Sequence, residues 1–173
     1  MRQALTDGSS STRYLTPERG ASVTARPLRH GDVRTVIGIF DRLSDRSRRY
    51  RFNGPKPCLS RSELIQLATV NADRQALVAY AEDGRDPVGI AQFVRDGDSA
   101  EIAFAVVDEY QRRGIGSALV AQLMADARAD GVREMTALVS AGNTAALTLL
   151  RRMASALSVS YEGSELAVRA AIA

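Results

Sequence analysis

Apolar residues recur at two different spacings along this chain, and the changes between them predict alternating helices and strands. Val33, Val36 and Phe40 stand at helical spacing, and Asp32 before them is a good N-cap. Residues 75–80 instead form a short, mostly apolar run, which is typical of a strand. By these criteria helices are expected at residues 32–40, 60–68, 114–129 and 143–153. Strands are expected at residues 22–28, 75–80, 87–94, 100–107, 134–139, 157–161 and 165–168.

Turn residues between the predicted strands indicate how they pair. Asp83-Gly84-Arg85-Asp86 and Asp96-Gly97-Asp98 separate three consecutive strands by short turns, which favours an antiparallel meander. The element order contains no sustained parallel repeat. The pattern predicts a mixed α/β (α+β) domain over residues 21–173, with a mostly antiparallel central sheet of about six to seven strands flanked by about four helices. Residues 1–20 show little periodicity and are expected to form a flexible N-terminal tail.

The composition narrows the class of protein. No apolar run approaches the roughly 20 residues that cross a bilayer, and the N-terminus lacks the apolar core of a signal peptide. We therefore expect a cytoplasmic location and no membrane partner. The net charge of +3 suits an anionic ligand, but no basic stripe with interleaved aromatic residues predicts nucleic-acid binding. The single cysteine, Cys58, and the single histidine, His30, disfavour a disulfide, a Cys–His nucleophile and a zinc site, so no metal is expected.

One segment carries a recognisable chemical pattern. A predicted strand runs into Gln111-Arg112-Arg113-Gly114-Ile115-Gly116, which opens a predicted helix. The first N–H groups of a helix have no intrahelical partner, and the helix dipole adds partial positive charge there. Gly114 and Gly116 allow a ligand to approach the backbone closely, and Arg112 and Arg113 add positive charge. The segment therefore predicts an anion site, and a pyrophosphate group suits it.

Two other glycine motifs do not fit this segment. A P-loop needs Gly-Lys followed by Ser or Thr, and no lysine stands here. The dinucleotide fingerprint needs a third glycine in an early βαβ unit. A plain helix N-terminus with glycines for packing is the remaining alternative, and the complete strand-to-helix context favours the anion site over it.

The segment closely resembles the acetyl-CoA motif of the general N-acetyltransferase (GNAT) superfamily, Gln/Arg-x-x-Gly-x-Gly/Ala, which stands here as Gln111, Gly114 and Gly116. The resemblance covers about residues 22–168 and implies the GNAT fold, with acetyl-CoA as the acyl donor. It implies that residues 112–117 hold the pyrophosphate and that backbone groups of the preceding strand meet the acetyl and pantetheine arm. The cofactor-binding residues implied in this way are Phe104, Ala105, Val106, Gln111, Arg112, Arg113, Gly114, Ile115, Gly116, Ser117 and Asn143.

A narrower resemblance is to the bacterial Pat-type protein acetyltransferases. The segment Phe40-Asp41-Arg42-Leu43-Ser44, followed by Ser47, Tyr50, Arg51 and Phe52, is similar to their helical segment. Two departures from the family pattern concern the last helix. Leu150 stands where the family often has a tyrosine general acid, and Ala154-Ser155 replaces the usual Gly-Phe. The tyrosine acid is therefore missing or supplied elsewhere.

Glu101 is the candidate general base. A lysine ammonium has a pKa of about 10.4, so a base must remove its proton before the amine attacks near pH 7. Strand alternation puts Glu101 on the face of Ala103 and Ala105, which leaves space beside it. The resemblance agrees, because Pat-type enzymes use a glutamate at this strand position as the base. The alternative is a solvated glutamate at the start of a strand.

Together these observations predict an N-acetyltransferase that moves an acetyl group from acetyl-CoA to a primary amine, such as a protein lysine, by direct attack on the thioester. Two alternatives stay open: acetylation of a small amine, and a non-catalytic acyl-CoA-binding regulatory module, to which the missing tyrosine gives weight. A homodimer is also left open.

Overall fold

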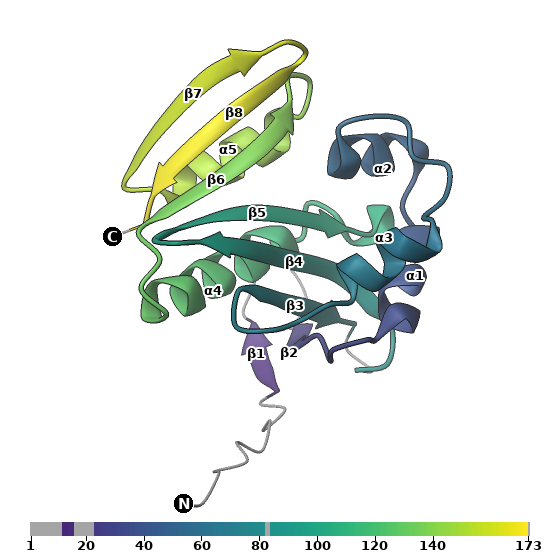
Figure 1. Ribbon diagram of the computed structural model, residues 1–173. Helices are drawn as coiled ribbons and strands as arrows, with labels where there is room; N and C mark the ends of the chain where they lie inside the picture. Colours follow the sequence, from purple (N-terminus) through teal and green to yellow (C-terminus); the bar gives the residue numbers. More distant parts are fainter. Residues whose placement is uncertain (1–11, 16–22, 82–83, 173) are drawn as a thin grey trace, which may run out of the picture.

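The strands form a single twisted sheet. The computed structural model describes residues 12–15, 23–81 and 84–172, and the strands in these ranges lie in the order β1-β2-β3-β4-β5-β6-β8-β7 (Figure 1). They are β1 (Arg13–Leu15), β2 (Val23–Pro27), β3 (Arg74–Tyr80), β4 (Pro87–Asp96), β5 (Ser99–Val106), β6 (Glu134–Ser140), β7 (Ala156–Glu162) and β8 (Glu165–Ala171). Every neighbouring pair is antiparallel except β5 with β6. The predicted fold class, a mixed and mostly antiparallel sheet with flanking helices, is confirmed.

Helices cover both faces of the sheet. They are α1 (Val33–Asp41), α2 (Asp45–Phe52), α3 (Arg61–Leu67), α4 (Ile115–Ala129) and α5 (Thr144–Met153), with a short 3-10 helix at Asp108–Tyr110. On one face, Leu119 and Leu123 of α4 pack in the main core with Phe93 of β4. On the other face, Ile39 of α1 lies in a second core with Ile90 of β4. Alternate residues of β4 therefore serve two different cores.

The described residues contain one strand and one helix more than the upper predicted numbers. The extra strand, β1, lies inside the segment predicted as a flexible tail: Leu15 is buried, and Arg13 forms an ion pair with Asp126 at 2.6 Å. A three-residue strand is too short to show periodicity, and pairing with β2 stabilises it. Residues 1–11 and 16–20 of the predicted tail lie outside the described residues. The extra helix, α2, buries no residue fully, so it has no apolar stripe that a sequence pattern could reveal.

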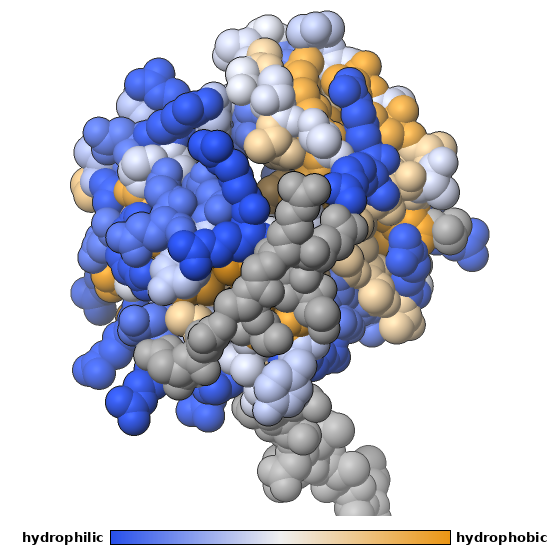
Figure 2. Space-filling model, turned by 180° about the vertical axis from the view of Figure 1, so that it is seen from behind, coloured by the Kyte–Doolittle hydropathy of each residue, from blue (hydrophilic) through white to orange (hydrophobic). Residues whose placement is uncertain are grey.

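The surface differs between the two ends of the molecule. Seen from behind, apolar residues gather over the end formed by β6, β7, β8 and α5, whereas the end with α1–α3 is mostly hydrophilic (Figure 2). On β7, Val159 and Tyr161 are exposed. Within the described ranges, none of the helices has the length and apolar character needed to span a membrane.

Candidate active site

The N-terminus of α4 is arranged to bind an anion. Gly114 precedes the helix with a φ of 81°, a left-handed conformation that favours glycine, and no side chain caps the helix. The Ala118 N–H donates to the Gly114 carbonyl at 3.0 Å. The preceding N–H groups, of Ile115, Gly116 and Ser117, therefore have no intrahelical acceptor. Because the 15-residue helix also adds its dipole, these adjacent donors fit a pyrophosphate group.

The two arginines of the preceding loop differ in their contacts. Arg113 donates to the Glu109 carbonyl at 2.8 Å, and its guanidinium lies 5.0 Å from the centre of the Tyr110 ring. Arg112 is exposed, with a φ of 59°, and no hydrogen bond or ion pair of its side chain is present in the described part of the chain. Arg112 is therefore the better placed of the two to meet an anion.

Gln111 connects the loop to α2. Its amide nitrogen donates to Ser47 Oγ and to the Val106 carbonyl, each at 3.0 Å. Asp108 accepts from the Ser44 N–H at 2.9 Å, from Ser44 Oγ at 2.7 Å and from Ser47 Oγ at 2.9 Å. Burial would raise the pKa of Asp108, but these hydrogen bonds outweigh it and lower the pKa below its usual 3.8. The network fixes the start of α2 against the loop.

The sheet opens between β5 and β6. Residues 99–101 pair in parallel with residues 134–136, and beyond these pairs the two strands diverge (Figure 1). A cavity of about 80 Å³ lies in this gap, lined by β5, β6 and the start of α5. Such a gap leaves backbone groups of both strands without strand partners, and those that no side chain contacts are available to a ligand.

Alternation along β5 decides which of its backbone groups face the gap. The Val107 N–H donates to the Val88 carbonyl of β4 at 2.9 Å. Because neighbouring residues of a strand direct their N–H groups to opposite sides, the N–H groups of Val106 and Phe104 face the gap, whereas Ala105 pairs with β4. The geometry therefore favours Phe104 and Val106 over Ala105 as donors to the arm of the cofactor.

Helix α5 carries the predicted cofactor residue Asn143 at its start and Leu150, at the usual tyrosine position, in its second half. Asn143 lines the gap, and its Oδ1 accepts from the Ala146 N–H at 3.2 Å, which caps the helix. Its amide nitrogen has no hydrogen-bond partner in the described residues and is available to a ligand. Leu150 is 1% exposed and lies in the main core, so the usual tyrosine position supplies no acid in this chain.

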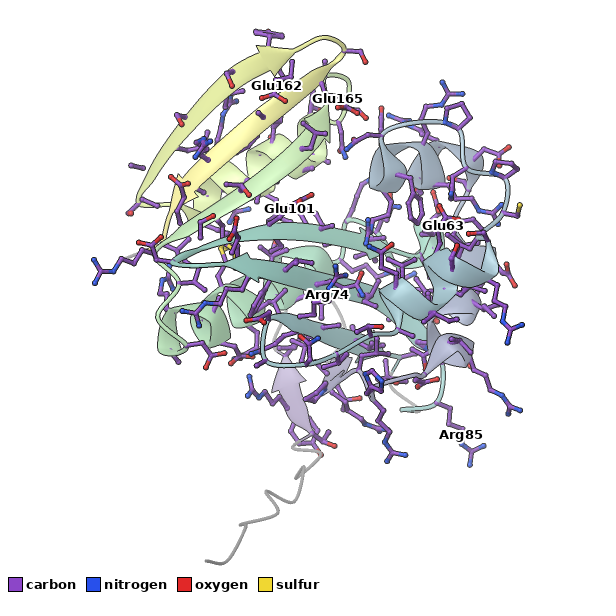
Figure 3. All side chains as sticks on the ribbon, viewed as in Figure 1. Glu63, Arg74, Arg85, Glu101, Glu162 and Glu165 are labelled. Atoms are coloured by element: carbon purple, nitrogen blue, oxygen red, sulfur yellow. The ribbon has the colours of Figure 1, made fainter. Side chains whose placement is uncertain are left out.

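Glu101 lies where two cavities meet. The register of β4 and β5 puts it on one face with Ala103 and Ala105, as alternation predicted. It lines the cavity in the gap and also a larger cavity of about 370 Å³, which α2, α3, β3 and β4 surround. Figure 3 labels Glu101 on β5 together with Arg74 on β3 and Glu63 on α3, which also line the larger cavity.

Arg51 of α2 lines both cavities beside Glu101. Its Nη2 donates to Gln92 Oε1 at 2.9 Å. Burial lowers the pKa of Arg51 to about 10, and the negative charge of Glu101 opposes that shift, so the guanidinium stays protonated at neutral pH. The site therefore holds a fixed positive charge next to the candidate base. Sequence reasoning missed this contact, and the signal that could have found it is Gln92, the one polar residue within the predicted strand 87–94.

Side chains of α2 and of its C-cap residue, Asn53, also bridge the gap. Tyr50 Oη donates to the Gly142 carbonyl at 3.1 Å, and Asn53 Nδ2 donates to the Leu138 carbonyl at 3.1 Å. Ser140 Oγ donates to Asn53 Oδ1 at 3.1 Å. Sequence reasoning missed these contacts, because they join segments more than 80 residues apart.

The profile of the acetyltransferase (GNAT) family matches residues 41–154, more than half of the chain. The chain belongs to the GNAT acetyltransferase family. It is 34% identical over 131 residues to acetyltransferase PA5475 of Pseudomonas aeruginosa, with 73% of this chain and 70% of that protein covered. It is 35% identical over 133 residues to acetyltransferase Pat of Mycolicibacterium smegmatis, with 74% of this chain but 39% of that longer protein covered. The crystal structure of the GNAT domain of S. lividans PAT has a TM-score of 0.82 and 26% identity, with 91% of this chain and 95% of that chain covered.

Membership of the GNAT family identifies acetyl-CoA as the acetyl donor. GNAT acetyltransferases are enzymes that use acetyl-CoA, and in this chain the N-terminus of α4 and the gap between β5 and β6 fit its pyrophosphate and its arm. The described ranges contain no group of three or more His, Cys, Asp or Glu residues that could hold a metal ion. The roles of individual residues stay predictions.

Proposed function

We propose that this GNAT enzyme acetylates the amine of a lysine side chain in a protein, with Glu101 as the general base. The observation that carries the proposal is the position of Glu101, which lines both the gap that would receive the thioester and the larger cavity that would receive the acceptor. A carboxylate at this junction can take a proton from an ammonium as the nitrogen approaches the acetyl group.

Acetyl-CoA supplies the acetyl group as a thioester. The N–H groups of Ile115, Gly116 and Ser117 would hold its pyrophosphate, and the exposed Arg112 would add a charge. The Phe104 N–H and the Asn143 amide would bind the arm. These groups come from separate elements that meet around the gap.

The chemical step needs one base and one oxyanion donor. Glu101 accepts a proton from the lysine ammonium, and the neutral nitrogen forms the new N–C bond as the C–S bond breaks. The second proton, which the nitrogen loses as it becomes an amide, neutralises the departing thiolate. The Val106 N–H, which faces the gap, stabilises the negative charge that develops on the carbonyl oxygen. The CoA thiol is expected to have a pKa of about 8.5, the value for free cysteine, so it leaves readily as its anion. The reaction therefore does not need a general acid at the position where Leu150 replaces the usual tyrosine.

The charges of the larger cavity support a lysine over a polyamine. Its charged residues are Arg51, Arg74, Glu63 and Glu101, and Glu63 is already paired with Lys56. A polycation would favour a cavity with more unpaired carboxylates.

The test is Glu101→Gln, which preserves the size of the side chain and removes the base. Turnover at neutral pH should fall roughly 100- to 10,000-fold while acetyl-CoA affinity stays almost unchanged. Raising the pH should recover part of the loss, because more of the amine is then neutral without help. The control is Glu109→Gln, because Glu109 precedes the loop with its side chain 77% exposed and should matter little.

Several outcomes would contradict the proposal. Full activity of Glu101→Gln at neutral pH, or a larger defect from Glu109→Gln, would remove Glu101 as the base. Faster acetylation of spermidine than of protein lysines, detected by mass spectrometry, would favour a small-amine enzyme. Binding of acetyl-CoA without turnover on any amine would indicate a non-catalytic module.

A further inference from the structure

We infer that the larger cavity, called here the acceptor cavity, selects a lysine that has an acidic residue two positions away, and that Arg74 binds the carboxylate of that residue. The inference rests on the proposed function, because it assumes that the lysine amine reaches Glu101. It adds the sequence context that the enzyme would prefer.

The acceptor cavity has an excess of positive charge. Glu63 forms an ion pair with Lys56, and this contact together with hydrogen bonds from Ser60 lowers the pKa of Glu63 to about 2. The Glu63 carboxylate therefore stays ionised, and the charge of Lys56 offsets it. Arg51 and Arg74 then face one remaining carboxylate, that of Glu101. The cavity can therefore accept one further negative charge from a ligand.

Arg74 is the arginine of the cavity that lacks a partner. Arg51 already donates to Gln92 at 2.9 Å and lies close enough to Glu101 for its pKa to respond to that charge. The side chain of Arg74 is half-buried, and it makes no hydrogen bond or ion pair with any other described residue. A half-buried guanidinium with free donors can form a charge-assisted, bidentate pair with a carboxylate from the acceptor.

The register of β3, β4 and β5 fixes the distance between Glu101, where the lysine amine would lie, and Arg74, where the acceptor carboxylate would bind. Arg74 lies opposite Val94, and Val94 lies opposite Glu101, so the three residues form one row across β3, β4 and β5. Adjacent strands are about 4.8 Å apart, which puts the backbones of Arg74 and Glu101 about 10 Å apart on the same face. Val94 between them is 38% exposed and offers an apolar floor to the methylene groups of a lysine.

An extended peptide matches this row. Its side chains alternate, so residues two positions apart point the same way and lie about 7 Å apart at the backbone. With the lysine amine at Glu101, an Asp or Glu two positions away can reach Arg74. When Glu101 takes up the proton and loses its charge, the acceptor carboxylate is left as the partner of the cavity arginines.

The experiment compares pairs of peptides that differ only in Glu or Gln two positions from the lysine. The wild-type enzyme should acetylate the Glu peptide with a kcat/KM on the order of tenfold higher, as expected for one charge-assisted hydrogen bond. In Arg74→Gln this ratio should fall close to one, chiefly through KM, and Arg74→Lys should retain most of it. Arg49→Gln is the matched control, because it removes a positive charge from the exposed surface of α2, outside the cavity, and should leave the ratio unchanged.

The outcomes separate this inference from the proposed function. If the wild-type enzyme acetylates both peptides equally, the acidic preference is wrong while lysine acetylation stands. If 6-aminohexanoate reacts faster than any peptide and much faster than hexylamine, carboxylate recognition stands but the acceptor is a small molecule. If no peptide or amine reacts, both fail. If Arg49→Gln lowers the ratio as much as Arg74→Gln does, the acidic preference comes from the overall positive charge and not from a contact with Arg74. If Arg74→Gln does not fold, the ratios of the wild-type enzyme and of Arg74→Lys still decide the test.

Discussion

Gly114 is needed both for the left-handed backbone before α4 and for the space that the pyrophosphate would occupy. Its φ of 81° is left-handed, and it precedes the free N–H groups of α4. Gly114→Asp should therefore abolish acetyl-CoA binding in isothermal titration calorimetry, because a carboxylate would stand where the pyrophosphate is expected. A non-glycine residue in this conformation also costs about 1 kcal/mol of stability.

The control for Gly114→Asp is the same substitution at Gly163, a distant glycine that also has a left-handed backbone conformation. Gly163 has a φ of 64° in the turn between β7 and β8, with open space around it. Gly163→Asp should lower stability by a similar amount and bind acetyl-CoA normally. Measurable binding by Gly114→Asp, or loss of binding in Gly163→Asp, would remove the assignment of the pyrophosphate to this loop.

Residues whose position depends on local pattern were predictable, and residues whose position depends on strand register were not. Gly114 follows from the spacing of its motif, and the face of Glu101 follows from strand alternation. Arg74 and Arg51 join the same cavity only through the register of β3 with β4 and the packing of α2. Neither can be deduced from residues near them in the sequence.

At the scale of elements, polar contacts hold α2 in place. Asp108 accepts hydrogen bonds from Ser44 and Ser47, and its pKa in the folded protein is lowered below 3.8. Its stabilising contribution is therefore present above pH 3.8 and is lost as the pH falls through the lower folded-state value. Asp108→Asn should melt at a lower temperature than wild type at pH 7, and the difference should shrink as the pH is lowered below 3.8.

The adjacent Glu109→Gln serves as the control for Asp108→Asn in thermal melts monitored by circular dichroism. Glu109 is exposed and its contact with Arg42 is 3.6 Å long, so its removal should change stability little. Because α2 forms a wall of the acceptor cavity, Asp108→Asn should also raise the acceptor KM more than the acetyl-CoA KM. A difference in melting temperature that stays constant from pH 7 to pH 3 would mean that the Asp108 carboxylate does not anchor α2.

The close approach of α4 to β4 depends on Gly89. A Cβ there would lie 3.2 Å from the Ala105 carbonyl oxygen and 3.2 Å from Leu119 Cδ1. Gly89→Ala should therefore destabilise the protein by about 1–3 kcal/mol in urea denaturation. Gly38→Ala, in the interior of α1 with its nearest atom at 3.8 Å, should instead stabilise it by about 0.5–1 kcal/mol. Equal effects of the two substitutions would contradict this account of the packing.

Elements with an apolar face were predictable, and elements held by distant polar groups were not. α4 and α5 bury regular stripes of leucine and other apolar residues, which the sequence shows directly. α2 and β1 depend on Asp108, Asp126 and pairing with β2, so their stability comes from tertiary contacts. Local pattern carries no signal for such contacts.

At the scale of the whole molecule, the gap divides the sheet into two parts. Among the described residues, strand pairing between β1–β5 and the unit β6–β8–β7 is limited to the parallel pairs of residues 99–101 with 134–136. Tyr50 of α2 and the C-cap residue Asn53 add the hydrogen bonds to Gly142 and Leu138. A ligand in the gap would touch both parts, so binding should tie them together.

This arrangement predicts the response of the protein to acetyl-CoA. A ligand at 100 times its Kd stabilises the folded state by about 2.7 kcal/mol, which for a domain of this size raises the melting temperature by roughly 5–11 °C. Hydrogen exchange, followed by mass spectrometry, should slow in peptides from both sides of the gap, β5 with its Phe104 and Val106 N–H groups and β6. Peptides from β2 should slow less, because that strand lies three strands away from β5, next to the edge strand β1. Gly114→Asp with the same ligand should show neither effect, and slowing confined to α4 would mean that the arm of the cofactor does not enter the gap.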